Sequence, residues 1–590
     1  MRSLSRIPDC FGLHAAEDFF SFVPMTRISA HWRPLLLLAL GALLYARTLA
    51  GDFVLDDQSA IRDNPIVRQG DLAQIFTTDY WAGFHHDRSG LYRPLTMWTF
   101  ALNHRLAGAV PFSYHLINIL LHGAIGALLY LVWRRCLEQE ELAWWAALLF
   151  TVHPVFSEAV AGLVGRADLL AALFALLALH QHLGARLARW RHLLAGAALL
   201  AALLSKENAV VLPALLLLTD LFQYRGFSQK CYWRAHLYYA GLTLLYLGVR
   251  HLVLGGLLIA QIDPFDNPLA NLAPSLRWAN ALLILGRYLE LLVLPLRLCA
   301  DYSFAALPLA PHWSLPTLLL AAAVPTALGL LLWATWRALP WAALGLGWLL
   351  AGLLPVANLL FPIGTGMAER LLYLPAAGFA LAAAALLGTL GKGPALACRT
   401  VLALCLAWGT WVRTGDWQNE YLLFSKAVQV QPKSARAWYV LGKSALARGE
   451  EPLALRCWQQ ALEIFPGYYE IYDALGVVHY KRGDYPEAGE LFTRCLELKS
   501  NYTPAWLNLG LARYRLGQQE KAREAFQKAL SLDPNYASAY YNLGVMELEE
   551  KKTAQARDLF LKALACDPDY KEAHINLEAA EKLLQREIVR

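Results

Sequence analysis

The sequence predicts an all-α protein in two parts: a polytopic membrane helix bundle, and behind it a solenoid of repeated helix pairs. Hydrophobic residues make up 57% of the 590 residues and charged residues only 17%, which is typical of a membrane protein. Charged residues are sparse up to Arg413 and dense beyond it, so the average combines a membrane part with a soluble part. The soluble part also repeats its sequence with a fixed period.

Charge and cysteine usage exclude two other classes of protein. The formal net charge of +6 is modest, and many of the arginines flank apolar runs. That placement fits a positive-inside bias better than nucleic-acid binding. The nine cysteines are scattered, with no Cys-x-x-Cys pair and no Cys/His cluster at zinc spacing. They indicate neither a disulfide framework nor a metal site.

Twelve apolar runs divide the first part of the chain into expected membrane segments, several of them short enough to be broken or tilted. They cover residues 34–50, 112–133, 142–160, 168–184, 192–205, 208–222, 235–254, 278–296, 315–336, 340–360, 370–390 and 395–412. The basic flanks of these runs are expected to face the cytoplasm; they are Arg134/Arg135, Arg186/Arg189/Arg191, Arg225/Lys230/Arg234, Arg337 and Lys392/Arg399. Strict alternation of all twelve runs would place the C-terminal part in the cytoplasm, whereas the flanks at Arg337 and Lys392 place it outside. The two agree if one segment near 255–296 is re-entrant or lies along the membrane interface. We therefore expect about eleven crossings, with the C-terminal part outside.

The resulting domain plan has four parts. Residues 1–30 form an N-terminal cytoplasmic tail, in which Met25 would be a more natural start. Residues 31–413 form the membrane domain, with a first outer loop at 51–111. A linker helix at 414–434 leads into the repeats of 435–590.

The repeats have a period of 34 residues. Leu-Gly pairs end at Gly442, Gly476, Gly510 and Gly544, and an alanine and an aromatic residue keep the same interval. Proline or serine closes each turn. This is the tetratricopeptide pattern of paired helices, in which small residues allow close helix packing. We expect four repeats and a final capping helix, forming a groove that binds peptides.

The first outer loop opens with two adjacent carboxylates, Asp56 and Asp57, just after the first apolar run. Like charges so close raise one another's pKa. In the expected topology, nearly every ionisable residue that is not a cytoplasmic flank falls on the same outer side. Because charges at membrane depth usually line a wet cavity or pair with one another, we expect one polar cavity open to the outside.

One helix also carries a polar stripe. His115, Asn118 and His122 fall at i, i+3 and i+7 on an otherwise apolar run. Interhelical hydrogen bonding is slightly favoured over substrate contact as their role.

Six short segments, in this order, carry a resemblance to a known family. They are Phe53-Val54-Leu55-Asp56-Asp57, Tyr92-Arg93-Pro94-Leu95, His153-Pro154-Val155-Phe156-Ser157-Glu158-Ala159-Val160, Gly165-Arg166-Ala167-Asp168, Ser205-Lys206-Glu207 and Ala368-Glu369-Arg370-Leu371-Leu372-Tyr373-Leu374-Pro375. With the repeats behind them, they resemble the transmembrane and tetratricopeptide-repeat O-mannosyltransferases. Those enzymes belong to the multispanning glycosyltransferases of type-C fold. The resemblance covers residues from about 34 to 580, although the repeat array is shorter than is usual in that family.

The resemblance implies an inverting transfer of a hexose, mannose in that family, from a polyprenyl-phosphate sugar to Ser or Thr of exported proteins. A carboxylate must take the hydroxyl proton, and cations must hold the phosphate. By motif position the base is Asp56 or Asp57, and the other orients acceptor or sugar. The expected donor-binding residues are Arg93, His153, Glu158, Arg166, Asp168, Lys206, Glu207, Glu369 and Arg370. For each cation a purely structural ion pair stays an alternative.

The tetratricopeptide array is expected to recruit the protein acceptor. The main alternative is a non-enzymatic membrane-anchored scaffold, and a flippase or transporter is a weaker one. The sequence identifies no definite cofactor, a divalent metal stays open, and no nucleic-acid partner is expected. The Ala/Leu/Arg-rich usage favours a bacterial inner membrane with the active site and repeats in the periplasm, or the endoplasmic reticulum lumen in a eukaryote.

Overall fold

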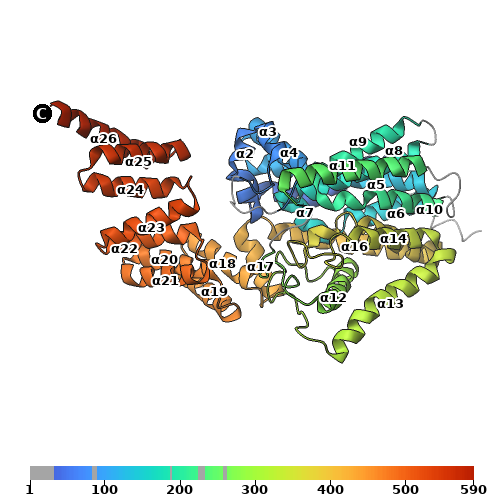
Figure 1. Ribbon diagram of the computed structural model, residues 1–590. Helices are drawn as coiled ribbons and strands as arrows, with labels where there is room; N and C mark the ends of the chain where they lie inside the picture. Colours follow the sequence, from blue (N-terminus) through green and yellow to red (C-terminus); the bar gives the residue numbers. More distant parts are fainter. Residues whose placement is uncertain (1–31, 83–89, 186–188, 224–232, 257–261, 590) are drawn as a thin grey trace, which may run out of the picture.

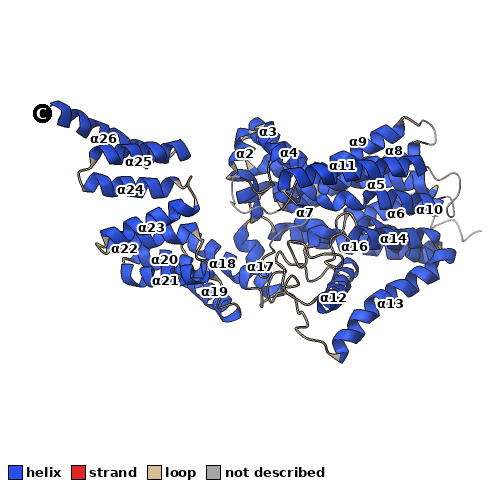
Figure 2. Cartoon of the chain, viewed as in Figure 1, coloured by secondary structure: helices blue, strands red, loops and turns tan. Residues whose placement is uncertain are grey.

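The computed structural model describes residues 32–82, 90–185, 189–223, 233–256 and 262–589. Over these residues the protein consists of helices and loops without strands, which confirms the all-α prediction (Figure 2). Figure 1 shows two bodies along one axis. The first is a helix bundle that ends with α16 (Lys392–Asp416), and the second is a helical array that follows α17 (Glu420–Val430).

Six segments of the bundle are long and apolar enough to cross a membrane. They are Arg33–Ala50, Pro111–Leu137, Leu163–Gly184, Trp233–Leu254, Leu315–Ala338 and Lys392–Asp416. Three further apolar segments are shorter: Arg191–Ser205, Pro340–Leu353 and Ala376–Leu390. The described part of the chain is thus a multi-pass membrane protein. The eleven crossings and the re-entrant segment stay predictions.

The helices of the bundle follow the apolar runs of the sequence. In order they are α1 (Arg33–Tyr45), α5 (Pro111–Leu137), α6 (Glu140–Thr151), α8 (Arg166–Gly184), α9 (Arg191–Ser205), α10 (Leu212–Gln223), α11 (Trp233–Leu254), α12 (Pro274–Val293), α13 (Leu315–Ala338), α14 (Pro340–Leu353), α15 (Ala376–Leu387) and α16. Between them lie α2 (Pro65–Gln69), α3 (Leu72–Thr77), α4 (Pro94–Ala107) and α7 (Ser157–Ala161). Short 3₁₀ or π turns cover Ala46–Ala50, Gln58–Arg62, Pro154–Phe156, Leu163–Gly165, Glu207–Val211, Glu369–Leu372 and Gly388–Leu390.

Small residues allow the bundle helices to approach closely. A Cβ atom on Gly123 of α5 would lie 2.6 Å from the carbonyl oxygen of Leu38 in α1. Between α14 and α15, a Cβ atom on Gly378 would lie 2.3 Å from the carbonyl oxygen of Gly345. Such contacts are a usual way for helices to pack where lipid provides no hydrophobic driving force. Side chains such as Trp333 of α13, which is 80% exposed, form the apolar outer face expected against lipid.

The array consists of four helix pairs and a final helix. The pairs are α18 (Ala435–Ala447) with α19 (Glu451–Ile464), α20 (Tyr469–Arg482) with α21 (Tyr485–Leu498), α22 (Thr503–Arg515) with α23 (Gln519–Leu532) and α24 (Ala537–Glu549) with α25 (Thr553–Cys566), followed by α26 (Lys571–Val589). Each repeated glycine faces the aromatic residue of its own pair: a Cβ atom on Gly510 would lie 2.5 Å from the ring of Phe526. The 34-residue interval therefore preserves one close contact per repeat.

The first helix pair is docked on two loops of the bundle. Arg436 forms ion pairs with Asp266 and Asp301, and the hydroxyl of Ser434 donates to Asp301 Oδ2 at 2.6 Å. Next to these polar contacts, the ring of Phe265 lies 4.7 Å from that of Tyr468, between centroids. This mixed polar and aromatic contact fixes how the array begins relative to the bundle.

Candidate active site

The acidic pair lies on a loop in an unusual backbone conformation. Leu55, the residue before Asp56, has φ = +52°, in the left-handed region that non-glycine residues rarely adopt. Such a residue costs about 1–3 kcal/mol and persists only where its surroundings hold it. Here Glu420 of α17 provides the restraint, because its Oε1 accepts hydrogen bonds from the Leu55 N–H at 3.0 Å and Gln58 Nε2 at 3.4 Å. The linker to the repeats therefore helps to shape the acidic loop.

Asp57 points inward and is completely buried. Its Oδ1 accepts from the N–H of Val164 at 2.8 Å, and its Oδ2 accepts from the N–H of Val54 at 3.2 Å. Burial raises the pKa of Asp57 to about 7, and the charge of Asp56 adds to the rise, while these backbone donors oppose it. Asp57 thus anchors the loop to the segment between α7 and α8.

Asp56 points the other way and is 45% exposed at its side chain. Its Oδ2 lies 3.7 Å from Nη1 of Arg370. The same guanidinium lies 3.4 Å from Glu158 Oε1 through its Nε, and the Arg370 backbone N–H donates to Glu158 Oε2 at 2.9 Å. Arg370 is 31% exposed. Asp56 and Arg370 therefore form the accessible edge of the site.

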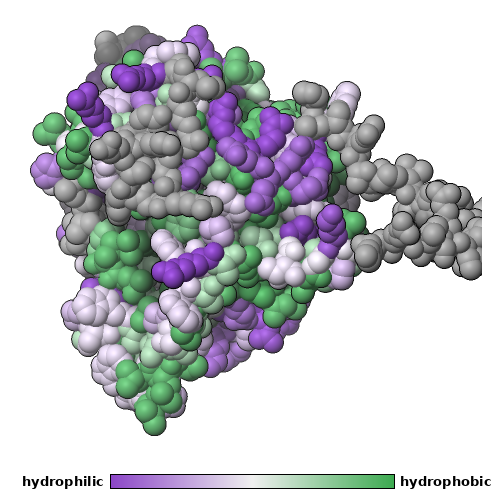
Figure 3. All heavy atoms as spheres, turned by 90° about the vertical axis from the view of Figure 1, so that its right-hand side faces the viewer, coloured by the Kyte–Doolittle hydropathy of each residue, from purple (hydrophilic) through white to green (hydrophobic). Residues whose placement is uncertain are grey.

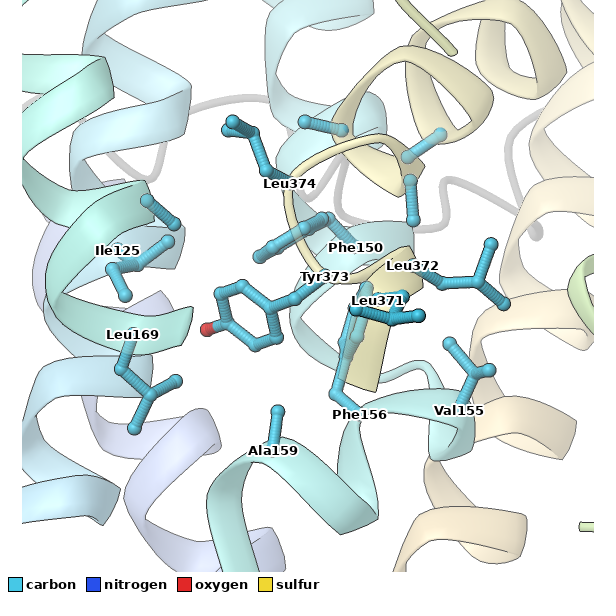
Figure 4. Close-up of a cluster of buried hydrophobic side chains, with 14 of the residues drawn as sticks. Ile125, Phe150, Val155, Phe156, Ala159, Leu169, Leu371, Leu372, Tyr373 and Leu374 are labelled. Carbon is cyan, nitrogen blue, oxygen red and sulfur yellow. The ribbon is translucent and has the colours of Figure 1, made fainter. Parts of the chain in front are cut away.

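An apolar cluster beside these charges holds the two motif segments together (Figure 4). The ring of Phe156 lies 4.8 Å from that of Tyr373 and 4.5 Å from that of Phe150, between centroids. Because Phe156 is two residues from Glu158 and Tyr373 is three residues from Arg370, this packing sets the distance between carboxylate and guanidinium. The apolar positions of the motifs thus position the charged ones.

Two further ion pairs continue the site. Lys206 Nζ lies 2.6 Å from both carboxylate oxygens of Asp168, and both side chains are buried. Burial lowers the pKa of Lys206 to about 8, although Asp168 opposes the shift. Arg93 Nε donates to Glu207 Oε2 at 3.0 Å, and its guanidinium lies over the ring of Tyr80 at 5.2 Å.

These residues form one electrostatically coupled group, which we call the transfer cluster. It contains Asp56, Asp57, Tyr80, Arg93, Glu158, Asp168, Lys206, Glu207, Arg250 and Arg370. With Asp57 protonated, four carboxylates face four cations. A balanced set of charges lowers the cost of burial, because each ion has a partner. The structure thus brings together eight of the eleven residues that the sequence suggested.

The other three suggested residues make their direct hydrogen bonds elsewhere in the bundle, although Arg166 interacts electrostatically with Asp57 and Tyr80, and Glu369 with Glu158. Arg166 is completely buried, where it donates to Asn118 Oδ1 at 2.9 Å and Asn103 Oδ1 at 3.1 Å. His153 Nε2 lies 2.9 Å from the carbonyl oxygen of Leu292. Glu369 Oε1 accepts from the hydroxyl of Tyr302 at 2.6 Å. Through these hydrogen bonds, all three residues link segments of the bundle.

The polar stripe of α5 shows the same behaviour. Asn118 contacts Arg166 of α8, and His122 Nδ1 lies 2.7 Å from the hydroxyl of Tyr373. Both contacts join different parts of the bundle, as the hydrogen-bonding interpretation predicts for these two residues. For His115, the third residue of the stripe, the described residues show no such contact.

Sequence reasoning left out three residues that the structure places at the site. The buried hydroxyl of Tyr80 has no hydrogen-bond partner within the described part of the chain, and its ring lies against Arg93. Arg250 donates to the carbonyl oxygen of Gly90 at 2.7 Å beside Glu207. Glu420 holds the acidic loop from the linker.

Among the described residues, the carboxylates of the transfer cluster do not converge on a metal-binding set with His or Cys. One group of three such residues does bring its donor atoms within 4.8 Å of one another, and it consists of His182, Asp220 and His236. It lies at the far end of α8. His182 is fourteen residues from Asp168 along this helix, which corresponds to about 21 Å.

Comparison with known proteins agrees with this architecture. Residues 90–253 match the family model described as dolichyl-phosphate-mannose-protein mannosyltransferase. Tetratricopeptide models match residues 422–467, 439–503, 510–548 and 537–570. The first match covers α4 to α11, which supply most of the transfer cluster, and the others cover the array.

Three relatives show how far the similarity extends. A protein O-mannosyl-transferase of Caenorhabditis elegans is 31% identical over 449 residues, which are 74% of this chain and 63% of that protein. Protein O-mannosyl-transferase Tmtc3 of Drosophila melanogaster is 31% identical over 71% of this chain and 54% of its own length. Protein O-mannosyl-transferase TMTC4 of Homo sapiens is 30% identical over 74% of this chain and 67% of its own length. The chain thus spans about half to two thirds of the relatives it matches, and it belongs to the protein O-mannosyl-transferase family of multi-pass membrane proteins with tetratricopeptide repeats.

Proposed function

We propose that this protein transfers a hexose, mannose by its family, from a polyprenyl-phosphate sugar to Ser or Thr hydroxyls of exported proteins. The observation that carries the proposal is the accessible contact between Asp56 and Arg370 at the edge of an otherwise buried ion-pair network. A proton acceptor and a phosphate-binding cation are the two groups that such a transfer needs. Here both are exposed and lie side by side.

The roles follow from exposure. Asp56 is the general base: it takes the hydroxyl proton while the acceptor oxygen bonds to the anomeric carbon. The bond from that carbon to the phosphate oxygen breaks, its electron pair leaves with the polyprenyl phosphate, and the anomeric configuration inverts. Arg370 binds the phosphate, for which a guanidinium is suited. Buried Asp57 orients the loop. Lys206 and Arg93 stabilise the negative charge of the leaving phosphate without contacting it directly.

Two further residues complete the site. The unpartnered hydroxyl of Tyr80 is placed to hydrogen-bond a sugar hydroxyl or phosphate oxygen. The carboxylate of Glu158 contacts both the guanidinium and the backbone N–H of Arg370, so it fixes the orientation of the guanidinium.

The repeat array recruits the acceptor protein. Because its first pair is docked beside the bundle, a peptide bound there has a raised effective concentration at the site. By the positive-inside bias, the transfer cluster and the repeats share the outer side of the membrane, which is the periplasm of a bacterium or the endoplasmic reticulum lumen of a eukaryote.

The test is transfer of radiolabelled mannose from a polyprenyl phosphate to an exported acceptor by the purified full-length protein. The expected result is labelled protein with the native chain and background with Asp56→Asn. Equal background for both would support a non-enzymatic scaffold. Protease digestion of the repeats in sealed membranes tests sidedness, and cleavage only from the cytoplasmic face would refute the proposed topology.

A further inference from the structure

A second polar group lies in the bundle, away from the transfer cluster. His182 comes from the last turns of α8, Asp220 from the last turn of α10, and His236 from the first turn of α11. Three segments far apart in sequence thus each contribute one side chain. All three are buried, with exposed fractions of 1%, 2% and 8%. The end of the bundle that carries them faces the viewer in Figure 3, where hydrophilic side chains gather among hydrophobic ones.

The three donor atoms converge on a small volume. His182 Nε2 lies 3.1 Å and His236 Nε2 lies 3.0 Å from the same carboxylate oxygen, Asp220 Oδ2. A tetrahedral zinc ion with bonds of about 2.0 Å holds its donor atoms about 3.3 Å apart. The two distances from the imidazoles to Asp220 are close to that value, and all three donor atoms lie within 4.8 Å of one another. A set of two imidazole nitrogens and one carboxylate oxygen is one that zinc accepts.

A second layer fixes the orientation of one imidazole. Nδ1 of His182 lies 3.1 Å from the hydroxyl of Tyr239, and this hydroxyl lies 2.8 Å from Nδ1 of His192. An outer hydrogen bond at Nδ1 leaves Nε2 to face the ion and is the usual support of a metal-binding histidine. Three imidazoles therefore cluster here, with ring centroids of His182 5.5 Å from His192 and 5.3 Å from His236.

We propose that His182, Asp220 and His236 form a binding site for a divalent transition metal ion, with Zn²⁺ as the best fit. Three protein ligands leave one position for water or another donor. The ion would tie together the ends of α8, α10 and α11. Because the site lies about 21 Å along α8 from Asp168, its role is structural and separate from sugar transfer.

The same contacts without a metal would be a hydrogen-bond network in which both imidazoles donate to Asp220. The experiment must separate these two states. Full-length protein in detergent is stripped with a chelator, equilibrated with Zn²⁺, freed of excess ion and analysed for bound metal by mass spectrometry. Co²⁺ then replaces Zn²⁺, because a tetrahedral site gives visible absorption bands that a hydrogen-bond network does not.

The variants are His236→Gln, Asp220→Asn and Tyr239→Phe, with His251→Gln as the matched control on the exposed surface of α11. We expect about one Zn²⁺ per native or control chain, loss of this ion in the first two variants, and about tenfold weaker binding in Tyr239→Phe. Gel filtration of the metal-free proteins checks folding. Equal metal content in all chains, or none in the native chain, would overturn the proposal and leave a hydrogen-bond network.

Discussion

Helices α8 and α9 each connect two polar clusters, and the clusters differ in access. At one end, Asp168 and Lys206 belong to the transfer cluster, whose edge residues Asp56 and Arg370 are 45% and 31% exposed. At the other end, His182 and its neighbours are almost completely buried. A site for a mobile substrate needs an open edge, whereas a site that only joins helices can be closed. The following predictions test this division, beginning with the largest effect.

Asp56→Asn should lower the transfer rate by about 10²- to 10⁴-fold, because it removes the general base. Folding should survive, since the side chain is half exposed. The control is Asp63→Asn, whose side chain is also 45% exposed. Rates come from labelled-mannose transfer and folding from thermal melts. A rate loss as large in the control would mean that Asp56 has no special role.

Arg370→Lys should reduce kcat/KM for the donor by about 10- to 100-fold, because an ammonium cannot contact Asp56, Glu158 and a phosphate with fixed geometry. The control is Arg62→Lys, whose exposed side chain pairs with Asp63 in the loop that carries Asp56. Varying the donor concentration separates KM from kcat. Unchanged donor kinetics would remove Arg370 from the phosphate site.

The transfer rate should rise with pH through about 7, where Asp57 ionises. Its negative charge next to Asp56 makes that residue a better base. The stability of the fold changes in the opposite direction. In the folded chain Asp57 keeps its proton up to about pH 7, whereas in the unfolded chain it releases the proton near pH 3.8. The contribution of Asp57 to the free energy of unfolding therefore falls as the pH rises from about 4 to 7. In Asp57→Asn the rise in rate near pH 7 should disappear. A native rate independent of pH from 6 to 8 would contradict the assignment.

Tyr80→Phe should lower kcat/KM by about three- to tenfold, the value of one hydrogen bond. Among the described residues the hydroxyl has no hydrogen-bond partner, so its removal should leave the melting temperature unchanged. Tyr130→Phe removes a hydroxyl bonded to Glu140 instead and serves as the control. A lower melting temperature without a kinetic effect would show that Tyr80 is structural.

Glu420→Gln should reduce kcat by about two- to fivefold, because neutral hydrogen bonds to the Leu55 N–H and Gln58 are weaker than charge-assisted ones. The donor KM should not change, since Glu420 acts through the loop. Glu463→Gln, on the exposed surface of α19, is the matched control. Equal rates for both variants would mean that the linker does not position the acidic loop.

The sequence predicted the helical class for physical reasons, and eight of the residues that it suggested for the site lie together in the structure, while their roles stay predictions. Apolar runs must form helices where no water satisfies the backbone, and the fixed 34-residue interval reflects the packing of Gly510 against Phe526 and its equivalents. Charged residues next to apolar runs had to find partners, so Asp56, Glu158 and Arg370 could be grouped before their distances were known.

Other features depend on side-chain direction, which motif order does not encode. Arg166 and Asp168 are two residues apart, yet Asp168 contacts Lys206 and Arg166 contacts Asn118. Tyr80 and Glu420 reach the site from a loop and from the linker, and no local pattern indicates either. The His182, Asp220 and His236 group lacks any sequence spacing typical of metal ligands, because its members come from three helices.

The contacts of Arg436 and Phe265 hold the first helix pair of the array at a fixed position relative to the bundle. A recognition motif seated at a given repeat would then lie at a set distance from Asp56. Only hydroxyls within a certain number of residues of that motif could reach the base, so modified positions should recur at characteristic separations from it. The array would then select the modified position by its distance from the bound motif, in addition to binding the acceptor.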